Sequence, residues 1–320
     1  MLPYLTTVFR RSWRMFITVA KVMVPVMIIV QIAQELGLVE QVGYIIAPAM
    51  ALLNLPPEAG IIWATTLLMG IYGGIATLSG LASTLDLTSG QLSALCAMML
   101  LTHALPVEQS VVRRAGASFS ATAALRIGAA LIYGAAASWA SRLTGLLDDP
   151  VSFDWLRGAS DTATATQSGF LAWGLATLFS LGLTLIIIVI LVVVLDGLDR
   201  LGLTKRFTAA TMPLLRMSGL DAQVAPVTTV GVLLGLTYGG ALIIEESSKQ
   251  NFSARTRFLA LSWLSLSHAL IEDTLLMIAL GADIWVVLVG RVLLTMGLIA
   301  ALAKLTNRGG WRVASCAGPG

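Results

Sequence analysis

Two histidines, His103 and His268, are the side chains best suited to chemistry, and the chain contains no others. An imidazole that titrates near pH ~6.5 can carry a proton or ligate a metal ion. An acidic residue follows each histidine by five positions, Glu108 in one case and Asp273 in the other. Glu272 also comes four residues after His268, which would place both on one helix face. The spacing predicts a paired site for a proton, a polar solute or a cation, with His268 and Glu272 as a candidate metal pair.

The same spacing recurs along the chain, because the sequence matches itself when it is shifted by the separation between His103 and His268. We call this separation the repeat interval. THALPVEQ at 102–109 aligns with SHALIEDT at 267–274, and Arg126 aligns with Arg291. Internal repeats of this kind are typical of secondary transporters. We therefore predict a first repeat, an acidic extracytoplasmic linker and a second repeat, with bounds 1–144, 145–168 and 169–320.

Glycine pairs interrupt two apolar segments at equivalent places, as GIYGG at 70–74 and GLTYGG at 235–240. A backbone turn at membrane depth is tolerated only where it lines a cavity or is buried in protein, and glycine permits such a turn. An arm of about 11 residues extends about 16 Å as a helix, which is roughly half of a bilayer. We predict two re-entrant hairpins with tips near the midplane, and a helix kink or a small-residue packing face is the alternative.

The candidate site residues fall into two groups. Those expected to bind a solute are the histidines, the hairpin tips and two hydroxyls: His103, His268, Tyr72, Gly73, Gly74, Tyr238, Gly239, Gly240, Thr102 and Ser267. Those expected to form charge pairs or to bind a coupling ion are Glu108, Arg126, Glu272, Asp273, Arg291, Glu245 and Glu246. A charge in hydrocarbon costs at least ~2.5–3.5 kcal/mol, so we expect Glu108 to pair with Arg126 and Asp273 with Arg291.

Composition indicates an all-α polytopic membrane protein. The 320 residues are 57% hydrophobic and 12% charged, with a mean hydropathy of +0.87. Several apolar runs reach the ~20 residues that cross a bilayer. The net charge of +3 does not point to nucleic acid, and the two cysteines form no CxxC motif. The sequence has neither GxxxxGK[ST] nor HExxH, so we expect neither nucleotide hydrolysis nor an enzyme.

Charge also favours six membrane spans over eight. With six spans, two hairpins and a cytoplasmic N-terminus, outside loops hold no basic residue except Arg142 and Arg157, as the positive-inside rule favours. Eight spans in parallel repeats would place the acidic linker inside. We predict two inverted repeats, each with three transmembrane helices plus one re-entrant helical hairpin. The protein would lie in a bacterial inner membrane with both termini cytoplasmic.

The chain resembles the Gate, or nucleoside-recognition, family in GLDAQVAPVTTVGVLLGLTYGGALIIEES (219–247) and LSHALIEDTLL (266–276). The first repeat has weaker copies, LPPEAGIIWATTLLMGIYGG (55–74) and LTHALPVEQSVV (101–112). Related domains occur in concentrative nucleoside transporters, in the membrane part of ferrous iron transport protein B and in spore maturation proteins. The resemblance implies a solute site where hairpins and broken helices meet.

The leading hypothesis is a secondary transporter or permease without a resident cofactor. Its substrate would be a small polar solute, nucleoside-like or cationic, bound at the midplane between the hairpin tips. Its partners would be membrane lipid and that solute, not nucleic acid; H+ or Na+ would be the coupling ion, and self-association into a homo-oligomer stays open. The alternatives are a divalent metal ion permease and a non-transporting membrane scaffold or regulatory protein.

Overall fold

The computed structural model describes residues 2–82, 84–153, 170–220, 224, 228–229, 231–232 and 252–308, and it contains no β-strand within them. The helices of the first half are α1 Leu2–Glu35, α2 Leu38–Leu52, α3 Pro57–Met69, α4 Ile71–Leu81, α5 Ser89–Thr102, α6 Leu105–Arg114 and α7 Phe119–Thr144. Those of the second half are α10 Phe170–Arg200, α11 Leu203–Met217, α14 Ala254–Leu266, α15 Glu272–Ala279, the π-helix η1 Trp285–Gly290 and α16 Arg291–Arg308. The predicted all-α class is confirmed.

Four helical segments of the described chain are long and apolar enough to cross a membrane: Ser89–Arg114, Phe119–Thr144, Thr177–Val194 and Trp285–Thr306. Their lengths match the ~20 residues that span ~30 Å of hydrocarbon. The chain is therefore a polytopic helical membrane protein, whereas the expected set of six spans stays a prediction.

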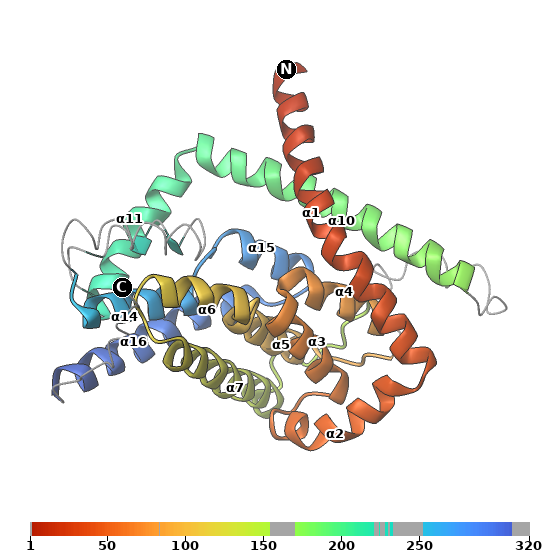
Figure 1. Ribbon diagram of the computed structural model, residues 1–320, viewed down its shortest axis with the longest axis horizontal. Coiled ribbons are helices and arrows are strands. Elements are labelled where there is room, and N and C mark those ends of the chain that lie inside the picture. The colour runs from red at the N-terminus through yellow and green to blue at the C-terminus, as the bar shows by residue number, and fades with distance from the viewer. Residues whose placement is uncertain are drawn as a thin grey trace, which may run out of the picture.

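Helix α5 lies at the centre of the helix bundle. The segments differ in the burial of their apolar 18-residue stretch. This stretch is 78% buried in Ser89–Arg114, 33% in Phe119–Thr144 and 28% in Trp285–Thr306. The central helix packs on α7 and also contacts α3, α14, α15 and η1. The long helices α1 and α10 pack on each other at one side of this bundle, and the N-terminal end of α1 projects away from it (Figure 1). A side chain at the end of α5 is thus enclosed by both halves of the chain.

The first glycine-broken segment forms two helices, α3 and α4, which pack against each other. The break falls at Gly70, whose φ of 95° is a conformation that side chains with a Cβ rarely adopt. Gly73 and Gly74 lie inside α4 rather than at the break. A Cβ on Gly74 would overlap Thr66 Oγ1, so this glycine allows α4 to approach α3 closely.

The helical segment that carries each histidine is interrupted at or next to that histidine. Residues 103–104 separate α5 from α6, and residues 267–271 separate α14 from α15; we call these the first and the second break. Pro106 is compatible with the first break, because it has no N–H to donate to the carbonyl four residues earlier. The second break forms without a proline, so proline is not the shared cause.

Backbone irregularities recur at the repeat interval found in the sequence. Positive φ angles occur at this interval in four pairs: Gly37 and Gly202, Asn54 and Gly219, Ala104 and Ala269, Gly116 and Gly281. Helices α2 and α11 also have the same length, 15 residues, and their first residues are separated by the same interval. The two halves thus share local backbone structure, and their inverted orientation stays a prediction.

Candidate functional site

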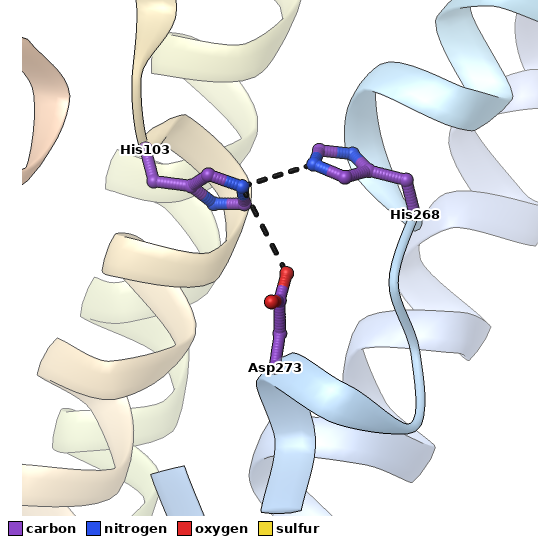
Figure 2. A group of neighbouring side chains, drawn as sticks. All are labelled: His103, His268 and Asp273. Carbon is purple, nitrogen blue, oxygen red and sulfur yellow. Dashed lines mark hydrogen bonds and ion pairs between the residues drawn. The ribbon is translucent and has the colours of Figure 1, made fainter. Parts of the chain in front are cut away.

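The two histidines meet at the centre of the molecule. His103 Nε2 lies 2.9 Å from His268 Nε2, and the ring centroids are 4.8 Å apart. Figure 2 shows the two rings pointing toward each other from different segments, with Asp273 aimed at them from the start of α15. Both histidines are buried, with 7% and 2% of their surface exposed. The pairing that the repeat suggested therefore brings two equivalent residues into direct contact.

The second nitrogen of each ring fixes which ring nitrogen carries hydrogen. His103 Nδ1 lies 3.2 Å from the Leu100 carbonyl oxygen, and His268 Nδ1 lies 2.7 Å from that of Leu264. A carbonyl oxygen only accepts, so each Nδ1 carries the hydrogen that it donates. A neutral ring then presents an unprotonated Nε2 to its partner. Two such lone pairs 2.9 Å apart need a proton or another cation between them.

Glu108 lies beside this pair of ring nitrogens. Its Oε1 is 3.2 Å from His103 Nε2 and 2.9 Å from His268 Nε2. Its other oxygen, Oε2, accepts a hydrogen bond from Arg126 Nη1 at 2.5 Å. The predicted Glu108–Arg126 ion pair is therefore confirmed, and it directs the free carboxylate oxygen toward both histidines.

Arg126 also stabilises the first break. Its Nε donates to the Leu101 carbonyl at 2.7 Å and its Nη2 donates to the His103 carbonyl at 3.0 Å. A helix end leaves such carbonyls without helical partners, and an unsatisfied buried acceptor costs ~1–3 kcal/mol. This fully buried guanidinium thus holds both the backbone and the carboxylate of the site.

Arg291 has the same position at the second break. It donates to the Leu266 carbonyl through Nε at 2.8 Å and to the His268 carbonyl through Nη2 at 3.3 Å. Nη2 also lies 3.3 Å from the Leu100 carbonyl, which joins the second half of the chain to the first. Arginines related by the repeat interval therefore satisfy equivalent carbonyls at both breaks, with or without a proline.

Asp273 departs from the expected symmetry. Its Oδ2 lies 3.8 Å from His103 Nε2 and is buried without a hydrogen-bond partner among the described residues. Arg291 Nη1 is likewise buried without such a partner. The second charge pair is therefore not built like that of Glu108 and Arg126. His103, His268 and Asp273 instead offer three potential ligand atoms within 4.8 Å of one another. The carboxylate that approaches the histidines is Asp273, whereas Glu272 is not in this group.

The hydroxyls expected to bind solute are engaged within the protein. Thr102 Oγ1 accepts from Trp63 Nε1 at 2.8 Å and donates to the Met98 carbonyl at 2.8 Å. Ser267 Oγ lies 2.7 Å from Thr295 Oγ1. These contacts indicate that both hydroxyls stabilise helix packing next to the site.

The remaining predicted residues lie either on α4 or outside the described residues. Tyr72 is half-buried on α4 and packs on the core. A Cβ on Gly70 would lie 3.6 Å from Ala104 Cβ, and Ala104 N–H donates to the Thr66 carbonyl at 3.1 Å. The α3–α4 segment therefore contacts the first break directly. The other predicted residues lie outside the described residues: Tyr238, Gly239, Gly240, Glu245 and Glu246.

Several residues that build the site were not identified from sequence. The Trp63 indole, the Thr66 carbonyl and the Thr295 hydroxyl support the two breaks through the contacts above. The Thr122 hydroxyl donates to Gln109 Oε1, which ties α7 to α6 one residue after Glu108. The repeat does not identify Trp63 or Thr66, because the equivalent positions of the second repeat hold different residues, Thr228 and Gly231. Only the fold reveals their role.

Comparison with known proteins finds similarity in sequence to one family and to one membrane protein. Residues 16–118 match the family model of the Gate domain, which is described as nucleoside recognition. This match contains α3, α4, His103 and Glu108. An uncharacterized membrane protein of Bacillus subtilis (strain 168), YvoD, is 28% identical over 301 residues, 92% of this chain and 91% of the relative. No solved structure matches the chain. The chain is thus a membrane protein, and its residues 16–118 match the model of the Gate, or nucleoside-recognition, family.

Proposed function

We propose that this protein is a secondary permease that binds a small polar solute or cation between its two repeats. The observation that carries the proposal is the contact of His103 with His268, equivalent residues that meet at 2.9 Å beside the buried Glu108 carboxylate. Ionisable groups inside a membrane protein are costly, and they commonly mark a solute or proton pathway.

Broken helices at membrane depth support the same proposal. The α5–α6 and α14–α15 breaks and the Gly70 break leave backbone groups that helices would otherwise satisfy. Such backbone is tolerated where it is buried or lines a cavity, and transporters place their sites at such breaks. We propose that α3 and α4 form a re-entrant hairpin, that residues 224–246 form its counterpart, and that the repeats are inverted with six spans in total.

Transport would follow from movement of the hairpins relative to the broken helices. The Ala104 N–H to Thr66 carbonyl contact joins α3 to the first break, and the Leu270 N–H to Val232 carbonyl contact joins the second break to a residue before the second glycine pair. Each contact is one hydrogen bond, worth ~0.5–1.5 kcal/mol, so it can break and reform. H+ or Na+ would couple to this movement in a bacterial inner membrane, with both termini cytoplasmic.

The proposal is tested by uptake into proteoliposomes. Purified protein is reconstituted and offered labelled nucleosides and divalent cations, beside protein-free liposomes and a His103→Gln variant that retains the wild-type circular dichroism. We expect uptake of a member of one panel, with at least a tenfold loss in the variant. Uptake that is unaffected by His103→Gln would refute the placement of the site. If well-folded protein transports neither panel, the scaffold or regulatory alternative gains support.

A further inference from the structure

The ring nitrogens at the centre of the molecule have the arrangement of metal ligands. Each Nδ1 of His103 and His268 donates to a backbone carbonyl, which leaves both Nε2 lone pairs directed at one point. Metal-ligating histidines almost always donate the second ring N–H to a carbonyl or carboxylate in this way. The two Nε2 atoms need a cation between their lone pairs. The hydrogen bonds that orient a metal-binding histidine are thus already present at both Nδ1 atoms.

Carboxylate oxygens complete the set of ligands. Glu108 Oε1 lies 3.2 and 2.9 Å from the two Nε2 atoms, and Asp273 Oδ2 lies 3.8 Å from that of His103. Metal–nitrogen and metal–oxygen bonds of ~2.0–2.2 Å place neighbouring ligands about 3.0–3.5 Å apart. The observed separations lie around this value. Within the described part of the chain, Asp273 Oδ2 is also buried without a hydrogen-bond partner, as expected of a carboxylate oxygen that binds a metal ion.

The chemistry of these ligands selects the class of ion. Imidazole nitrogens with carboxylate oxygens suit first-row transition metals such as Zn²⁺, Fe²⁺ and Co²⁺, whereas Mg²⁺ and Ca²⁺ prefer oxygen alone. We propose that His103, His268 and Asp273, with Glu108 as the fourth ligand, bind one divalent transition-metal ion. This inference rests on the proposed function because it names the ligand of the same site, but binding itself requires no transport.

Charge around the site favours exchange over permanent retention. The carboxylates of Glu108 and Asp273 are offset by the two fully buried guanidinium groups of Arg126 and Arg291. The formal charges of these four side chains cancel, so a divalent ion adds two charges to this group. Such an ion is held by ligand geometry more than by net charge, and it can leave when one ligand moves. This suits a transported ion better than a structural one.

The test measures metal binding by the full-length protein, purified in detergent through a tag without histidine and dialysed against a chelator. Co²⁺ is titrated while its visible absorption is followed, and bound metal is counted after dialysis. We expect one ion per chain, displaced by Zn²⁺ and not by equal concentrations of Mg²⁺ or Ca²⁺. His103→Ala and His268→Ala each abolish binding. Asp273→Asn removes a direct ligand and weakens binding more than tenfold, since even the loss of a residue that only supports a ligand costs about 10–100-fold.

Control variants separate the site from general effects. Asp283→Asn makes the same chemical change as Asp273→Asn at a carboxylate that caps η1, where Asp283 Oδ1 accepts from Trp285 N–H at 2.9 Å. Cys96→Ser removes the buried thiol of α5. Both variants should bind Co²⁺ like the wild type. If the histidine variants do not fold, pulsed electron paramagnetic resonance of Cu²⁺-loaded wild type detects imidazole nitrogen, and the chain has no other histidines to supply it.

The outcomes distinguish this inference from the proposed function. Absence of Co²⁺ and Zn²⁺ binding, or binding without an imidazole signal, overturns the metal site. Nucleoside uptake by a protein that binds no metal also overturns it and leaves the permease standing. Metal binding without uptake of metal supports the site and counts against the transport role.

Discussion

Arg126 connects the stability of the first break to the charge of the site, and its removal should be severe. It donates to the Leu101 and His103 carbonyls and to Glu108, and none of its surface is exposed. Removing one partner of a buried ion pair costs ~3–5 kcal/mol, and each orphaned carbonyl adds ~1–3 kcal/mol. The low ends of these ranges together predict that Arg126→Met lowers the free energy of unfolding by about 5 kcal/mol.

A double-mutant cycle isolates the ion pair from the carbonyl contacts. Glu108→Gln alone leaves Arg126 buried without its anionic partner, whereas the double variant removes both charges. We expect the two losses to be non-additive, with a coupling free energy of about 2–3 kcal/mol. The assay is reversible unfolding by SDS in mixed micelles, followed by far-ultraviolet circular dichroism.

The second repeat supplies the matched control for this cycle. Arg291 satisfies equivalent carbonyls, but its Nη1 and Asp273 Oδ2 have no hydrogen-bond partners. The cycle of Asp273→Asn with Arg291→Met should therefore give a coupling below about 1 kcal/mol. Additivity within about 0.5 kcal/mol in the first cycle, or equal coupling in both, would refute the reasoning.

Two further predictions concern the packing of α4 on α3 and the cause of the first break. Gly74→Ala should cost ~1–3 kcal/mol by overpacking, because its Cβ would overlap the Thr66 hydroxyl. Gly128→Ala, with nothing within 4 Å, is the control in the same thermal unfolding assay, and equal melting temperatures would contradict the close packing. Pro106→Ala should change stability by less than about 1 kcal/mol, since Ile271 occupies the equivalent place and the second break still forms. A loss of several kcal/mol would show that proline maintains the first break.

The sequence predicted part of the central arrangement. The repeat interval identified His103 and His268 as equivalent residues at one depth, and the cost of a lone buried charge predicted the partner of Glu108. Residue type and interval are visible in sequence, whereas the direct contact of the two rings depends on the fold. The all-α membrane class follows in the same way from long apolar runs.

The two helix breaks at the histidines could not be predicted from the sequence. Only one repeat has a proline there, and the carbonyls freed at each break are satisfied by an arginine on a helix that follows later in the chain. The second break also explains why Asp273, and not Glu272, lies near the rings. Residues 267–271 are not helical, so the helical spacing between His268 and Glu272 does not apply. Local patterns do not encode such distant hydrogen bonds.

The most direct test of the central claim is the thermal unfolding of purified wild type and of the single variants His103→Gln and His268→Gln with two ligand panels, nucleosides and divalent transition metals. A ligand present at about 100 times its dissociation constant should stabilise the wild type by ~2.7 kcal/mol. We predict that one panel gives this shift and that either substitution removes it, because residues from both repeats form one site. A shift that survives both substitutions, or the absence of any shift in the wild type, would contradict it.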